Sequence, residues 1–152
     1  MTKPLITTLL VPLDFAAPSS AALAQANKLA QKCGAEVVLQ YVVEPVRLPA
    51  EWTLAILTRY IDVEPKLVKH ANESLRELAQ THFANGVAVR YRVDKGPARE
   101  MILAAATEEN ADLIVIASHH KSRLGHLVQG STAEHVVRAA HCPVLKVQYD
   151  EE

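Results

Sequence analysis

Residues 112–136 read DLIVIASHHKSRLGHLVQGSTAEHV. The stretch opens with an apolar run, DLIVIAS, which is typical of a strand buried on both faces. A loop with two histidines and a lysine follows, and a helix then starts at Gly130-Ser131-Thr132. Many proteins hold a phosphate with a strand, a glycine-containing loop and a helix that opens on small polar residues. The stretch therefore predicts an α/β fold and a candidate ligand loop.

The rest of the chain repeats this alternation of strands and helices. Apolar or β-branched runs predict strands, and apolar stripes at helical spacing predict the helices between them. Such an order requires right-handed crossovers, which predict an open five-stranded parallel sheet with helices on both faces, a doubly wound α/β fold. The predicted strands are 5–13, 35–43, 87–93, 112–117 and 143–147, and the predicted helices are about 19–33, 64–83, 97–110 and 131–140.

Length and composition narrow the class of protein. A chain of 152 residues with 49% hydrophobic and 22% charged residues is expected to form one globular domain over 1–152. Its net charge of −1 gives no basic surface for nucleic acid or for an anionic membrane. No apolar run approaches the ~20 residues that span a bilayer. Two cysteines outside any CxxC pair are expected to be reduced thiols, which favours a cytoplasmic protein.

Polar residues follow two of the predicted strands in a pattern that suggests a site. In open α/β sheets, ligands bind beyond the carboxyl ends of the strands, where the strand order reverses. Pro12-Leu13-Asp14 ends the first strand, and Ala117-Ser118-His119-His120 ends the fourth. A ligand site shared by the first and fourth strands is therefore expected.

Two interpretations of Gly130-Ser131-Thr132 remain open. The first helical turn offers unpaired N–H groups and the positive end of the dipole to a phosphate. Ser131 and Glu134 also form a capping box, which satisfies the helix start without a ligand. Gly125 to Ser131 has the pattern GxxxxGS, but it lacks the lysine of a Walker A loop and is not one.

Two long segments resemble the universal stress protein family. They are LLVPLDFAAPSSAALAQANKLAQKCGAEVVLQYVVEP (9–45) and KGPAREMILAAATEENADLIVIASHHKSRLGHLVQGSTAEHVVRAAHCPVLKVQ (95–148). Nucleotide-binding members of that family carry G-x-x-G, nine residues and G-[ST] in the loop after the fourth strand. This chain keeps the nine-residue spacing and Gly130-Ser131, but Ala117 and His120 occupy the two earlier glycine positions.

The resemblance implies an adenine-nucleotide-binding fold that binds ATP or AMP, with Mg²⁺ or Mn²⁺ carried by the phosphates. It implies that Asp14 approaches the adenine or the ribose and that the backbone of Val42 faces the adenine edge. Ribose and phosphates would be surrounded by residues of the fourth strand, its loop and the last helix. The site residues expected on this basis are Pro12, Leu13, Asp14, Val42, Ile116, Ala117, His120, Gly130, Ser131 and Thr132.

Other residues have plainer alternatives. Asp14 is also suited to a turn that caps the first helix region. The C-terminal histidines lack the convergent spacing of a zinc site, and Cys142 before a proline suggests packing. The segment around Trp52, residues 47–62, is either a lid over the strand ends or a packed connection.

Two functions are consistent with these patterns. The first is a stress-linked regulatory module that binds ATP or a related adenine nucleotide between the first and fourth strands. The second is a nucleotide-independent interaction protein with a lapsed loop, a homodimer through residues 143–149, as the family resemblance implies. No acid, base or nucleophile set suggests a dedicated enzyme, so no catalytic residue is assigned and at most slow ATP hydrolysis is expected.

Overall fold

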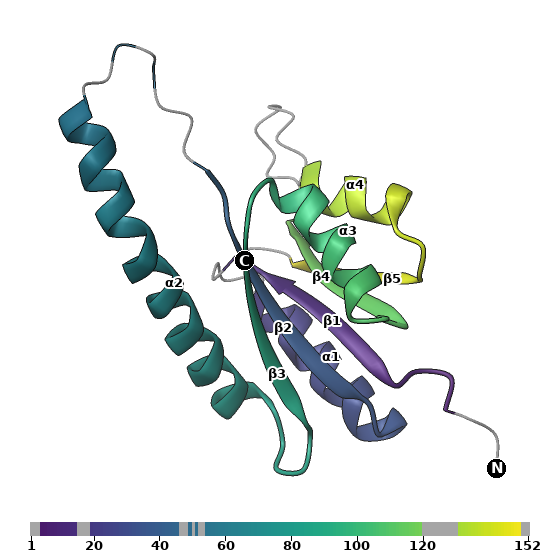
Figure 1. Ribbon diagram of the computed structural model, residues 1–152. Coiled ribbons are helices and arrows are strands. Elements are labelled where there is room, and N and C mark those ends of the chain that lie inside the picture. Colours follow the sequence, from purple (N-terminus) through teal and green to yellow (C-terminus); the bar gives the residue numbers. More distant parts are fainter. Residues whose placement is uncertain are drawn as a thin grey trace.

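The computed structural model describes residues 4–14, 19–45, 49, 51, 54–119 and 131–149 (Figure 1). Strands and helices alternate along these residues, as the sequence predicts. The elements are β1 (Thr8–Leu13), α1 (Ser19–Cys33), β2 (Glu36–Val43), α2 (Leu54–His82), β3 (Val89–Lys95), α3 (Ala98–Glu108), β4 (Leu113–His119), α4 (Ser131–Ala139) and β5 (Val144–Tyr149).

The five strands form one sheet in the order β3-β2-β1-β4-β5, and every neighbouring pair is parallel. The chain builds outward from β1 to β2 and β3, and then crosses back to place β4 on the other side of β1. The order therefore reverses between β1 and β4. The predicted doubly wound parallel sheet is confirmed.

Helices cover both faces of the sheet (Figure 1). One core lies between the sheet and α1 and α2, and the other lies between the sheet and α3 and α4. Alternate residues of β1 enter different cores, because successive side chains of a strand point to opposite faces. Leu9 and Val11 pack on the α1–α2 side, whereas Leu10 packs on the α3–α4 side.

Two predicted boundaries are wrong. β1 begins at Thr8 rather than at residue 5, and Leu5 is 92% exposed, so the apolar run overstates the strand. α2 begins at Leu54 rather than near 64 and continues through Pro65. Proline has no N–H to donate inside a helix and fits best in the first turn. Pro65 is nevertheless accommodated at an exposed position inside α2. The later start was expected because the apolar spacing becomes regular only from residue 64. No helix among the described residues is long and apolar enough to cross a membrane.

Asp112 holds the amino ends of β1 and β4 together. Its Oδ2 accepts hydrogen bonds from Thr7 N at 2.8 Å, Thr7 Oγ1 at 2.7 Å and Thr8 N at 3.1 Å. A carboxylate that accepts several backbone donors makes charge-assisted bonds, which are stronger than neutral ones. The two central strands are thus fixed at the end opposite to the candidate site.

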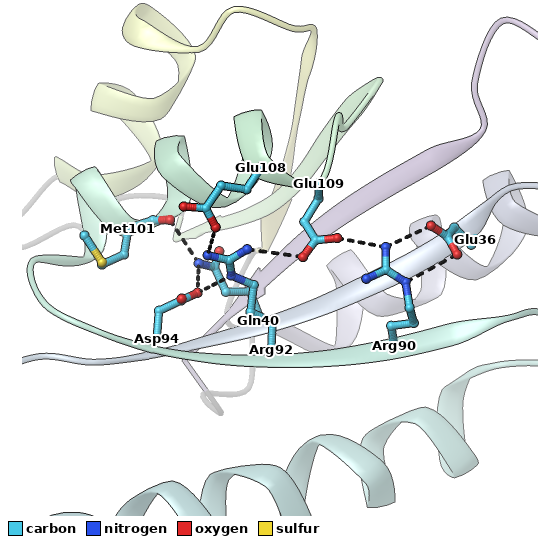
Figure 2. Close-up of polar contacts among 8 residues, drawn as sticks. All are labelled: Glu36, Gln40, Arg90, Arg92, Asp94, Met101, Glu108 and Glu109. Carbon is cyan, nitrogen blue, oxygen red and sulfur yellow. Dashed lines mark hydrogen bonds and ion pairs between the residues drawn. The ribbon is translucent and has the colours of Figure 1, made fainter.

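An arginine–carboxylate network holds α3 against β2 and β3 (Figure 2). Arg90 of β3 pairs with Glu36 at 2.9 Å and with Glu109 at 2.8 Å. Arg92, on the same strand, pairs with Glu109 at 3.2 Å and with Glu108 at 2.5 Å. Carboxylates at the carboxyl end of a helix are unfavourable, because the dipole is negative there. The two arginines offset this repulsion.

The network shifts the pKa values of its members. Hydrogen bonding to Glu36 raises the pKa of the Arg90 guanidinium, and hydrogen bonding to Asp94 raises that of Arg92. Partial burial alone would raise the pKa of Glu109. Hydrogen bonds from Arg90 and Arg92 outweigh burial, so the pKa lies below its ordinary value of 4.5. The folded state therefore favours ionised Glu109.

We predict that Glu109→Gln lowers the free energy of unfolding by about 1–2 kcal/mol at neutral pH, because hydrogen bonds to charged groups are lost. A lowered folded-state pKa stabilises the fold above the unfolded value of 4.5, and this contribution is lost as pH falls through the folded-state pKa. Urea unfolding of both proteins from pH 7 to pH 3 measures the effect. The gap between them should close at acid pH.

Glu108→Gln is the matched control, because Glu108 is adjacent but its side chain is 61% exposed, against 17% for Glu109. An exposed ion pair contributes little, so this variant should lose less stability. Equal losses in the two variants, or a gap that does not depend on pH, would contradict the prediction.

Candidate functional site

The carboxyl ends of β1 and β4 lie side by side, as their adjacency in the sheet requires. Their paired register, however, consists of Leu9 with Leu113 and Leu10 with Ile114. Both strands continue beyond these pairs, β1 to Leu13 and β4 to His119. The ladder between the two central strands thus stops short of the predicted site.

Pro12 explains why the ladder stops. Thr7 O accepts from Glu36 N near β2, whereas Thr8 O accepts from Asp112 N near β4. The backbone groups of a strand in a parallel sheet alternate between its two neighbours, so residue 12 faces β4, as residue 8 does. Proline has no N–H, so the next rung toward β4 lacks its donor. The backbone of β4 beyond Ile114 is left without that partner on β1.

The side chains of the predicted strand residues divide between the two faces of the sheet. Val42 and Ile116 pack against the α3–α4 core, and Pro12 shares their face because it alternates in register with Leu10. Ala117 packs against the α1–α2 core, and Leu13 belongs to that core. The structure therefore brings together the side chains of Pro12, Val42 and Ile116. Leu13 and Ala117 could serve a ligand on that face only through their backbone.

α4 begins at Ser131 and covers the same face, with Ala133 and Val136 in the core. The first turn of α4 contains Thr132, which is half-buried. Glu134 Oε1 accepts a hydrogen bond from Lys146 Nζ at 2.9 Å, which lowers the pKa of the Glu134 carboxyl. Glu134 thus joins α4 to β5 through Lys146. Its expected role in the capping box is a separate matter that this contact does not test. His120 and Gly130, also expected in the site, lie outside the described residues.

Asp14 follows β1 and is exposed to solvent. Its Oδ1 accepts a hydrogen bond from Ser19 Oγ at 3.0 Å, and Ser19 is the first residue of α1. This contact joins the strand end to the helix start, as the turn-capping alternative expects. The same exposed carboxylate lies at the carboxyl end of β1, where the ligand is expected. Both interpretations of Asp14 therefore remain.

Gln40 of β2 is a polar residue near the site that the sequence analysis did not single out. Its side chain is fully buried, and its Nε2 donates to Asp94 Oδ2 at 2.8 Å and to Met101 O at 3.1 Å. One signal was present in the sequence, because Gln40 interrupts the apolar run VVLQYVV of a strand covered on both faces. A polar side chain in such a run must find partners within the protein.

Metal and thiol chemistry find little support among the residues that the structure describes. Within this part of the chain, no group of three or more His, Cys, Asp or Glu residues is placed to hold a metal ion. Burial raises the pKa of the Cys142 thiol, which packs beside the α3–α4 core. A raised pKa keeps a thiol protonated and unreactive. Trp52, in the predicted lid or connection, lies outside the described residues, and α2 accounts for residues 54–62 of that segment.

The sheet, with its order reversing between β1 and β4, defines a doubly wound α/β protein. The sequence profile of the universal stress protein family matches residues 6–148, and the chain belongs to this family. Universal stress protein MJ0531 of Methanocaldococcus jannaschii is 31% identical over 143 residues, 92% of this chain and 81% of the relative. A universal stress protein of Thermus aquaticus is 32% identical over 143 residues, 93% of this chain and 98% of the relative.

Solved structures share the fold. That of MJ0577, a universal stress protein of Methanocaldococcus jannaschii, superposes with a TM-score of 0.79 at 23% identity, over 97% of this chain and 99% of the other. A universal stress protein solved in complex with cAMP has a TM-score of 0.64 at 19% identity, covering 94% and 97%. One from Archaeoglobus fulgidus, solved in complex with dAMP, has a TM-score of 0.58 at 18% identity, covering 94% and 98%.

We predict that Pro12→Ala extends the ladder between β1 and β4. The new amide at position 12 faces β4 and supplies the missing donor, so it should be protected from hydrogen exchange. Stability should change by less than about 1 kcal/mol, because the added bond offsets the greater freedom of the unfolded chain. Exchange measured by NMR checks the prediction. A position-12 amide that exchanges as fast as an exposed one would show that the strands diverge for another reason.

Proposed function

We propose that this chain is a single-domain regulatory module, over residues 1–152, that binds ATP or AMP at the carboxyl ends of β1 and β4. The observation that carries the proposal is the interrupted ladder at the reversal point of the sheet. Ligands of open α/β sheets bind at this place, and backbone groups of β4 beyond Ile114 lack their β1 partner there.

The surroundings favour a nucleotide over other small ligands. Pro12, Val42 and Ile116 give an apolar wall on the α3–α4 face, which suits a purine ring. α4 begins at Ser131 beside that face, and the positive end of its dipole favours phosphate oxygens. Two neighbours of this fold were solved with cAMP and dAMP, both of which contain adenine. Mg²⁺ or Mn²⁺ would then arrive on the phosphates.

The proposal is tested by calorimetric titration of nucleotide-stripped protein with ATP, with and without Mg²⁺. Micromolar binding is expected, and Gly130→Asp should weaken it at least ~10-fold, because a carboxylate beside α4 repels phosphate. Val137→Asp is the matched control, because it adds the same charge to an exposed position later in α4. No heat from the wild-type protein up to millimolar ATP would overturn the proposal.

We propose further that the protein is a homodimer through β5. β5 is an edge strand of the sheet, and Leu145 on it is 37% exposed. An edge strand presents unpaired backbone groups, to which a second copy can pair. Ile114 N donates to Pro143 O, so residue 143 faces β4. By alternation, residues 144, 146 and 148 point their backbone groups outward.

Gln148→Pro tests the dimer without disturbing the β4 ladder. The substitution removes an outward N–H at an exposed position, so the dimer should dissociate at least ~10-fold more readily while the circular dichroism spectrum is retained. Sedimentation velocity over a concentration series measures this, with Gln148→Ala as the control that keeps the N–H. A dimer that is unaffected by the proline, or a wild-type monomer at high concentration, would contradict the proposal.

A further inference from the structure

Among the described residues, Gln40 Oε1 is a buried side-chain oxygen that has no hydrogen-bond partner. Gln40 itself is 0% exposed. A buried acceptor without a donor costs free energy, and native proteins keep few of them. Such an atom therefore calls for a donor that the ligand-free chain does not supply.

The orientation of the Gln40 amide is fixed by its neighbours. Nε2 donates to Asp94 Oδ2 and to Met101 O, and both of these atoms are acceptors only (Figure 2). Rotating the amide by half a turn would place Oε1 against a carboxylate and a carbonyl, which repel it. Asp94 is itself held by Arg92 Nε at 2.6 Å. Oε1 therefore stays on the arm of the amide that points away from these two acceptors.

Gln40 lies among the residues of the candidate site. It is the register partner of Pro12, so the two side chains share a face of the sheet. Val42 is two residues further along β2 and shares that face as well, because side chains alternate along a strand. The free oxygen thus belongs to the layer of side chains against which a purine ring would lie.

We propose that Gln40 Oε1 accepts a hydrogen bond from the 6-amino group of a bound adenine, which makes Gln40 a specificity-determining residue. The inference rests on the proposed nucleotide site. Oε1 is fully covered in the ligand-free chain, so the side chains over it move aside when the base enters against Pro12 and Val42 and supplies the missing donor. A 6-oxo purine presents an acceptor at the same position, so it leaves Oε1 without a donor and adds repulsion. The proposed site would therefore distinguish adenine from hypoxanthine through one buried amide.

The test compares the affinities of AMP and IMP, which differ in the 6-amino and 6-oxo groups, for wild-type protein and Gln40→Met. The variant keeps the length of the side chain and removes the acceptor. AMP binding should weaken ~10-fold while IMP binding stays within about twofold, so the AMP/IMP preference falls ~10-fold. Leu39→Met is the matched control, because Leu39 is equally buried on β2 but faces the α1–α2 core. The AMP/IMP affinity ratio of Leu39→Met should equal that of the wild-type protein.

The possible outcomes separate this inference from the proposed function. Equal weakening of AMP and IMP in Gln40→Met would show a purely structural amide and overturn the inference alone. An unchanged AMP/IMP preference in a folded variant would do the same. A wild-type protein that binds neither ligand would overturn the proposed function, and the inference with it.

A measurement on wild-type protein covers the case in which Gln40→Met does not fold. Glutamine labelled with ¹³C at Cδ reports on the amide carbonyl, and the Gln40 signal is identified by its slowly exchanging side-chain N–H₂ group. AMP should move this signal downfield, as expected of a carbonyl that gains a donor, and IMP should not. A Gln40 signal that responds equally to both ligands would contradict the inference.

Discussion

The structure depends on burying β1 on both faces. All six residues of the strand are buried, and their side chains enter the two cores alternately. A strand in this position must be apolar throughout, and it needs helices on both sides to exclude water. The crossovers that supply those helices place β2 on one side of β1 and β4 on the other. The reversal point, and with it the candidate site, follows from the central place of β1.

Polar side chains in and around the two apolar cores are paired by hydrogen bonds or ion pairs. Asp112 serves the amino ends of β1 and β4, and the Arg90–Arg92 network serves the carboxyl end of α3. Gln40 is a partial exception. Its Nε2 donates two hydrogen bonds, whereas its Oε1 has no hydrogen-bond partner. Native proteins keep few incompletely satisfied polar groups in their cores, so each one requires an explanation.

The sequence carries much of the fold, since β-branched runs and helical stripes are local signals. The doubly wound parallel sheet follows from these signals, the family follows from the motifs that resemble it, and both are confirmed. The boundaries at Leu5 and Leu54 were wrong, because an apolar run does not reveal where solvent begins and the apolar pattern before residue 64 is less regular. Contacts between distant residues were out of reach. The partners of Gln40 lie 54 and 61 residues further along the chain, and Asp112 accepts hydrogen bonds from Thr7, which lies 105 residues earlier.

In the candidate site too, local motifs could be predicted from the sequence, whereas the arrangement of distant residues could not. Pro12-Leu13-Asp14 and the start of α4 were recognisable as sequence motifs. That Pro12, Val42 and Ile116 share a face, whereas Leu13 and Ala117 point to the other core, depends on register, which no local pattern specifies. The roles in ligand binding of the ten site residues expected from the sequence remain predictions.

The short ladder between β1 and β4 has a mechanical consequence. β1 pairs with β2 along its whole length, and β4 pairs with β5 along most of its own, but two pairs join the halves. The ladder of paired residues is therefore shortest between β1 and β4. α1 bridges this line, because it packs on β1 and β2 on one side and on β4 and β5 on the other. Opening of the sheet between β1 and β4 therefore requires α1 to leave one of the two halves, so α1 couples the halves across the short ladder.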